Sequence, residues 1–164
     1  MSEARTHNAA NQLTSIVATK GGTALTSFTY TLDDAGVRTA VEDLGGTESY
    51  TYDDLYRLTG VSYADGSSET YTYDGMGNRL TKVRGTTTTE YIYNDGDRLL
   101  QQEIHYPDGT SAVSPYFYDA NGNVTGHGGW GRSWDYENRL LKVETIAGTA
   151  TYTYRADGLR HSKT

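Results

Sequence analysis

Cysteine is absent from the 164-residue chain, and proline occurs at only two positions. The absence of cysteine excludes disulfides, thiolate metal sites and cysteine nucleophiles. Hydrophobic residues make up 35% of the chain, and the mean hydropathy is −0.67. This composition argues against a thick globular core and favours a thin, repetitive sheet with many turns.

Long apolar runs are also missing. No window approaches about 18 consecutive apolar residues, so the sequence predicts no membrane-spanning helix. Residues 1–10 lack the apolar segment of a secretory signal. The 14 basic residues are scattered and are outnumbered by 21 acidic residues, which gives a net charge of −7. Because nucleic-acid binding depends on clustered Lys and Arg, the charge argues against a nucleic-acid partner.

Tyrosine, by contrast, is abundant, with 15 copies. A Tyr-Asp signature recurs along the chain and is clearest at residues 71–80 (YTYDGMGNRL) and 50–58 (YTYDDLYRL). The position held by Tyr73, here called the anchor, recurs at intervals of 16 to 25 residues that average 21. The eight anchors are His7, Leu32, Tyr52, Tyr73, Tyr93, Tyr118, Trp134 and Tyr154. A period in this range indicates a repeat array, in which each unit is stable only when stacked on its neighbours.

The residues that follow each anchor predict a turn. Four residues after the anchor, seven of the eight positions hold Gly, Asn or Asp, which tolerate the left-handed backbone region; Tyr56 is the exception. One residue after the anchor, seven of the eight positions hold Asp or Asn, whose side chains accept hydrogen bonds from turn N–H groups; Arg155 is the exception. Each anchor should therefore end a strand and start a type I turn with a left-handed bulge residue.

A second set of turn signals falls about midway between the anchors, at residues 45–46, 65–66, 85, 107–109, 126–131 and 148. Two turns per repeat leave segments of about 6–8 residues, an ordinary strand length. We therefore expect an all-β fold: one domain over residues 1–164, built as a spiralling array of about eight antiparallel β-hairpins. Triplets such as residues 71–73 place two aromatic rings on one face, where we expect cross-strand aromatic pairs.

Five arginines recur with the repeat: Arg38, Arg57, Arg79, Arg98 and Arg139. We expect them to pair with a repeat carboxylate or a turn carbonyl on the sheet surface.

The recurring pattern Tyr-x-Tyr-Asp-x-x-Gly-Asn-Arg-Leu resembles the YD repeat of Rhs proteins. Residues 71–80 match it almost letter for letter, and residues 50–58, 116–124 and 134–140 match it closely. The resemblance implies a long antiparallel β-sheet that spirals into a hollow shell, as in bacterial Rhs and insecticidal Tc toxin components and in animal teneurins. It also implies an extracellular or cell-surface parent protein, from which we expect this segment to be excised.

In the toxins such a shell encloses a C-terminal effector. The 164 residues do not include the Asp-Pro segment that supports self-cleavage in complete Rhs toxins, because the only prolines are Pro107 and Pro115, and they do not include an effector domain. The resemblance therefore carries over architecture and neither self-cleavage nor toxicity. Eight repeats are also too few to close a shell.

We expect no enzyme activity, no cofactor and no metal. Residues 119–123 (DANGN) superficially resemble a calcium loop, but they coincide with a repeat turn and lack the later bidentate Glu of such loops. Acidic pairs such as residues 53–54 could supply the two carboxylates of a glycosidase, yet the first member of each pair has the turn role. The four histidines, His7, His105, His127 and His161, show no metal-binding spacing.

The repeat does not explain residues 126–131 (GHGGWG), where Trp130 is isolated among glycines. Exposed aromatic side chains on β-scaffolds stack on sugar rings, so Trp130 is the candidate ligand-contact residue; the alternative is that it packs on the sheet. The sequence thus predicts a non-catalytic structural module of a shell or surface scaffold. The alternative function is a carbohydrate-binding module that uses Trp130.

The chain itself is the expected partner. The strands predicted near residues 11–17 and 150–154 contain no proline or charged residue that would hinder edge-to-edge pairing. Because these two edges differ, copies would dock head to tail and form rings or open filaments.

Overall fold

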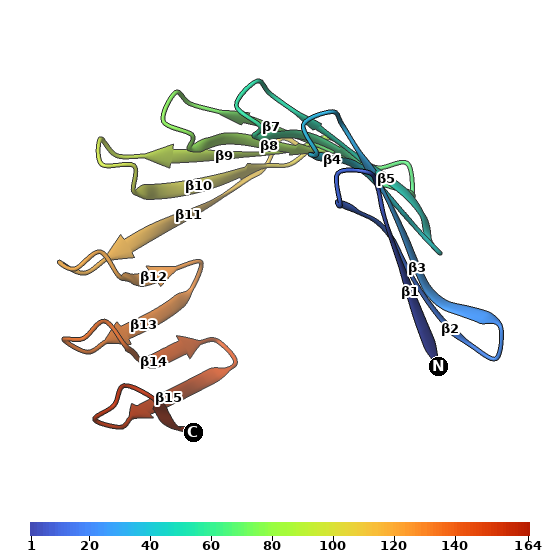
Figure 1. The fold of residues 1–164 in the computed structure, drawn as a ribbon. Helices are drawn as coiled ribbons and strands as arrows, with labels where there is room; N and C mark the ends of the chain where they lie inside the picture. Colours follow the sequence, from blue (N-terminus) through green and yellow to red (C-terminus); the bar gives the residue numbers. More distant parts are fainter. The chain divides into compact units, whose positions relative to one another are not determined.

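The computed structural model describes all of residues 1–164 and contains sixteen β-strands and no helix (Figure 1). The strands are β1 Ser2–His7, β2 Leu13–Lys20, β3 Thr23–Leu32, β4 Arg38–Asp43, β5 Gly46–Tyr52, β6 Leu58–Ser62, β7 Ser68–Tyr73, β8 Arg79–Arg84, β9 Thr87–Tyr93, β10 Leu99–His105, β11 Ser111–Tyr118, β12 Val124–His127, β13 Trp130–Trp134, β14 Leu140–Thr145, β15 Gly148–Tyr154 and β16 Arg160–Lys163. Their order in the sheet is their order in the sequence. The predicted all-β array of antiparallel hairpins is confirmed.

The turns have the predicted backbone conformation. All eight residues that lie four positions after an anchor have a positive φ, including Tyr56 at 58°. The sheet register shifts by one residue at the anchor; for example, Thr51 pairs with Gly60 whereas the next residue, Tyr52, pairs with Leu58. The same shift occurs at His7, Leu32, Tyr118, Trp134 and Tyr154. A left-handed residue that closes the turn and leaves one strand with an extra residue is a β-bulge.

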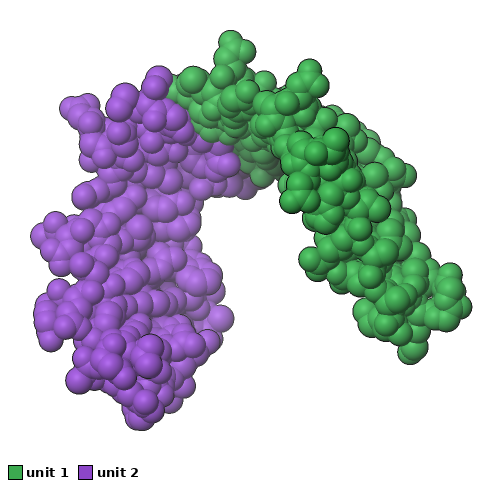
Figure 2. Space-filling model, viewed as in Figure 1, with its two compact units in different colours: residues 1–74, 81–88 green, residues 75–80, 89–164 purple.

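The chain divides into two compact units (Figure 2). Unit 1 comprises Met1–Asp74 and Thr81–Thr88, and unit 2 comprises Gly75–Leu80 and Thr89–Thr164. The expectation of one domain over the whole chain stays a prediction. No helix is present that is long and apolar enough to cross a membrane.

Neither unit has a conventional hydrophobic core. Each strand pairs only with its neighbours in sequence, and the only buried apolar side chains in the chain are Ala18 and Val61. Side chains alternate along each strand, so Tyr50 and Tyr52 are half-buried while Thr51 between them is exposed. We call the face that carries the anchors the aromatic face. Cohesion must therefore come from side chains that lie flat along this face.

The opposite face carries hydroxyl groups that are joined across strands. The Thr72 and Thr81 hydroxyls lie 2.7 Å apart, and those of Thr153 and Ser162 lie 2.8 Å apart. Threonine suits this face because its branched side chain favours the strand conformation and its hydroxyl can both donate and accept.

Candidate functional site

The anchor side chains tie each repeat to the one before it. The Tyr73 hydroxyl donates to the carbonyl oxygen of Leu58 at 2.7 Å, and Leu58 lies six residues after the preceding anchor. The same six-residue relationship holds for every anchor from Tyr52 onward, with donor–acceptor distances of 2.6 to 3.1 Å. At Trp134 the donor is the indole Nε1, which bonds the Val124 carbonyl at 2.9 Å. We call this bond the anchor tie.

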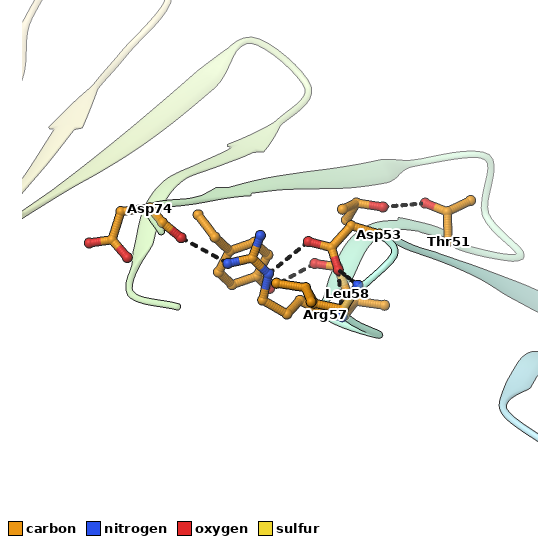
Figure 3. Close-up of polar contacts among 8 residues, drawn as sticks. Thr51, Asp53, Arg57, Leu58 and Asp74 are labelled. Atoms are coloured by element: carbon orange, nitrogen blue, oxygen red, sulfur yellow. Dashed lines mark hydrogen bonds and ion pairs between the residues drawn. The ribbon is translucent and has the colours of Figure 1, made fainter. Parts of the chain in front are cut away.

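The turn after each anchor is closed by the side chain that follows it. Asp53 Oδ1 accepts hydrogen bonds from the N–H groups of Leu55 and Arg57. Its second carboxylate oxygen accepts from Arg57 Nε at 2.7 Å (Figure 3). The backbone N–H of Arg57 is the largest cause that lowers the pKa of Asp53 below its usual value. The carboxylate is thus held ionised beside the arginine that it positions.

Arg57 then reaches the next repeat. Its Nη1 donates to the carbonyl oxygen of Asp74 at 2.8 Å (Figure 3), and its guanidinium carbon lies 4.9 Å from the centre of the Tyr73 ring. The expectation that repeat arginines pair with a carboxylate or a turn carbonyl is therefore confirmed at Arg57. Arg139 forms the same ion pair with the turn carboxylate, since its Nε lies 2.7 Å from Asp135 Oδ2.

The repeat arginines fall into two classes according to the ring that they cover. An arginine five residues after an anchor covers the next anchor; these pairs are Arg57 on Tyr73, Arg98 on Tyr118 and Arg139 on Tyr154. An arginine six residues after an anchor covers a tyrosine two residues before an anchor; these pairs are Arg38 on Tyr50, Arg79 on Tyr91 and Arg160 on Tyr152. The distances from guanidinium carbon to ring centre are 4.4 to 5.8 Å, within cation–π range.

This arrangement corrects the expectation that tyrosines from neighbouring repeats stack directly. Aromatic residues in equivalent positions lie two strands apart, about 9–10 Å at ordinary strand spacing, which is too far for ring contact. The guanidinium groups on the intervening strand fill this gap. A direct stack occurs between Tyr116 and His127, whose ring centres are 4.1 Å apart.

One acidic side chain is also buried on the aromatic face. The Glu69 side chain is only 4% exposed and lies 3.0 Å from Lys82 Nζ. The hydrogen bond from the Tyr71 hydroxyl is the largest cause that lowers the Glu69 pKa; burial opposes it, and the Lys82 ammonium adds to the lowering. Glu69 therefore holds neighbouring strands together as a paired carboxylate.

The predicted contact residue Trp130 lies at the start of β13 and is 50% exposed. Its ring has the Arg132 guanidinium 5.8 Å from its centre. Trp130 contributes to the lining of an open hollow of about 600 Å³, together with Phe117, His127 and the surrounding glycines. We call this the Trp130 hollow. Gly126 and Gly131 leave it unfilled, since a Cβ at Gly126 would meet the Phe117 ring at 3.1 Å.

The residues that resembled a calcium loop are used within their own turn. Asp119 Oδ1 accepts from the N–H groups of Asn121 and Asn123, and Asp119 Oδ2 accepts from Asn123 Nδ2. No group of three or more His, Asp or Glu side chains is placed to hold a metal ion.

The sequence reasoning missed the anchor tie and the buried Glu69. A signal for the first was available: six consecutive anchors are Tyr or Trp and none is Phe, which favours side chains that carry a hydrogen-bond donor. No comparable signal identifies Glu69, since the chain has 21 acidic residues.

No family model matches the chain. The tRNA nuclease WapA of Bacillus subtilis (strain 168) is 34% identical to it over 117 residues, which is 69% of this chain and 5% of that protein. The tRNA3(Ser)-specific nuclease WapA of Bacillus spizizenii matches to the same extent. The chain thus spans about 5% of the length of these curated relatives.

Solved structures agree with the repeat geometry. The crystal structure titled TcdB2-TccC3-TEV superposes with a TM-score of 0.64 at 14% identity, over 98% of this chain and 10% of that chain. The one titled TcdB2-TccC3-Cdc42 gives 0.61 at 16% identity, over 98% and 12%. The chain is a run of YD repeats of the Rhs type, and its fold is that of the Tc toxin repeats. At these identities the solved structures establish the fold of the YD repeats and not an activity.

Proposed function

We propose that this YD-repeat segment is a non-catalytic structural module that forms part of a β-sheet shell or of a surface or secreted scaffold. The observation that carries the proposal is the anchor tie, which recurs in six consecutive repeats with one geometry. A contact that repeats at every unit serves the continuity of the sheet, whereas a catalytic site would occur at one place and depart from the period.

The named activity of the relatives is consistent with this proposal. The two WapA proteins are nucleases by name, and the segment that aligns with this chain is 5% of their length. That leaves most of each relative to supply the nuclease activity. We propose that the parent protein of this chain lies outside the cell or at the cell surface, because the chain has the fold of toxin shell repeats and the proposed role is that of such a shell.

Incubation of the purified chain with total tRNA tests the absence of catalysis. The scaffold role predicts intact tRNA after prolonged incubation and a circular dichroism spectrum dominated by β-structure. Cleavage that copurifies with the chain and is lost on its thermal unfolding would contradict the role.

A carbohydrate-binding role is the second candidate, and Trp130 favours it. Its half-exposed ring borders the Trp130 hollow, and Phe117 on a neighbouring part of the lining is 59% exposed. Exposed rings beside an open depression are suited to stacking on the apolar faces of sugars. A glycan array separates the roles: a binding module gives saturable signals that Trp130→Ala removes and Tyr136→Ala retains, whereas a pure scaffold gives none.

A further inference from the structure

The junction between the repeats anchored at Tyr118 and Trp134 differs from the others. Each of the other junctions between aromatic anchors has an arginine five or six residues after the first anchor, and its guanidinium covers a ring. Here these two positions hold Asn123 and Val124. The amide of Asn123 is bonded to Asp119 and Asn138. No arginine from this turn therefore covers the aromatic face in front of Trp134.

The missing arginine leaves a hollow of about 390 Å³ within unit 2, here called the Trp134 hollow. It is lined by Tyr116, Asn123, Val124, His127, Arg132, Trp134 and Leu140. The volume lies within the range of about 300–1,000 Å³ typical of small-ligand sites. The walls are aromatic and aliphatic, with a few polar groups among them.

Two nitrogen-bearing side chains in this lining have unused hydrogen-bonding capacity. Arg132 is partly buried, and its guanidinium carbon lies 5.8 Å from the centre of the Trp130 ring; it has no hydrogen bond or carboxylate partner within the chain. His127 Nε2 lies 3.2 Å from the Tyr116 hydroxyl, whereas its Nδ1 is buried and has no partner. A guanidinium carries five donors in a planar fork, which can pair with a ligand that enters the hollow.

The charge of the lining selects among ligands. Arg132 is positive and no Asp or Glu lines the hollow, so a cation would be repelled. A neutral sugar would leave many hydroxyls against aliphatic and aromatic walls without partners. A carboxylate, in contrast, pairs with a guanidinium through two parallel hydrogen bonds, and an attached ring can lie against Trp134.

We propose that the Trp134 hollow binds an organic anion in which a carboxylate is joined to an aromatic or apolar ring. Arg132 binds the carboxylate, and Trp134, Val124 and Leu140 contact the ring. The site does not rest on the scaffold role, because it requires no catalysis or assembly, and it is a separate hollow from the Trp130 hollow although His127 lines both.

Phenylacetate is the probe, and its binding to the purified chain is measured by calorimetric titration. Saturable one-to-one binding is expected, with a loss of affinity of about tenfold or more in Arg132→Gln, since that change removes the charge-assisted pair. Arg155→Gln, which removes the same charge from an exposed turn position, should bind as the parent chain does. Equal affinity in Arg132→Gln and the parent would overturn the proposal.

One further variant tests where the ligand binds, and one analogue tests whether its carboxylate is recognised. Val124→Arg places an arginine six residues after the anchor, as at Arg79, so it should fill the hollow and abolish binding while the β-spectrum is retained. Retained binding in this variant would show that the ligand lies elsewhere. The neutral analogue 2-phenylethanol should bind at least about tenfold more weakly than phenylacetate; equal binding would refute recognition of the carboxylate. Each arm reports on the hollow, whereas the tRNA and glycan experiments report on the scaffold role.

Discussion

The guanidinium carbon of Arg57 lies 4.9 Å from the centre of the Tyr73 ring, while the hydroxyl of that ring donates to the carbonyl of Leu58, the residue next to Arg57. Two consecutive residues of the previous repeat thus contact one tyrosine side chain: Arg57 covers the face of its ring, and Leu58 accepts a hydrogen bond from its hydroxyl. In a sheet with almost no buried apolar side chains, contacts of this kind replace the hydrophobic core as the source of cohesion between repeats.

Arg57→Gln tests the arginine side of this arrangement. The change removes the cation–π contact, the bond to the Asp74 carbonyl and the ion pair with Asp53, and we expect a loss of about 1–2 kcal/mol in the free energy of unfolding. Urea denaturation measures it. Arg155→Gln, at an exposed turn position with no side-chain contact to a ring, is the matched control and should change the midpoint little; equal effects of the two variants would contradict the account.

The left-handed turn position gives a second prediction. Gly77 has a φ of 95°, and a Cβ placed there would meet no atom within 4 Å. Gly77→Val should therefore cost about 1–3 kcal/mol through backbone strain alone. The reciprocal change Tyr56→Gly relieves a non-glycine φ of 58° at a side chain that is 60% exposed, so it should be neutral or stabilising by up to about 1 kcal/mol. Thermal melts that rank the two variants in the opposite order would refute the turn assignment.

Glu69 predicts a dependence of stability on acid. Its pKa is lower in the folded chain than the ordinary value of about 4.3 for glutamate. The ionised group therefore stabilises the fold fully above that ordinary value, and this contribution is lost as the pH falls through the lower, folded-state pKa. The melting temperature should therefore fall as the pH is lowered below about 4.3.

Glu69→Gln should reduce this fall, because the amide does not titrate. The exposed Asp34→Asn should leave it unchanged. An identical fall in the parent and in Glu69→Gln would show that the buried carboxylate does not contribute. The lowered pKa values of turn residues such as Asp119 keep part of the dependence in every variant.

The sequence alone predicts the strands, the turns and their positive-φ residues, because each of these features depends on residues close together in the chain. Asp53 accepts the hydrogen bonds of its own turn, and Gly77 tolerates the positive φ that its turn requires. The contacts between repeats were harder to foresee. The bond from Tyr73 to Leu58 and the burial of Glu69 depend on which residues the register brings together on adjacent strands. The Trp134 hollow was missed for a related reason, since it arises from the absence of an arginine beside Val124, and an absence has meaning only once the role of the other arginines is known.

Self-association stays a prediction. In the isolated 164-residue chain, β1 and β16 each have one neighbour in the sheet, and unpaired edges favour pairing with another chain. Analytical ultracentrifugation at micromolar concentration should show species larger than the 18.0 kDa monomer. A single monomeric species across the concentration range would contradict the prediction, and electron micrographs would distinguish rings from filaments.

The central claim, that anchor ties hold the repeats together, is tested most directly by Tyr73→Phe. This change removes one hydroxyl and leaves the ring, its contact with Arg57 and its place in β7. We predict a loss of about 1 kcal/mol in the free energy of unfolding measured in urea, whereas Tyr136→Phe, at a side chain that is 86% exposed, should have no measurable effect. Equal stability of Tyr73→Phe, Tyr136→Phe and the parent chain would contradict the claim.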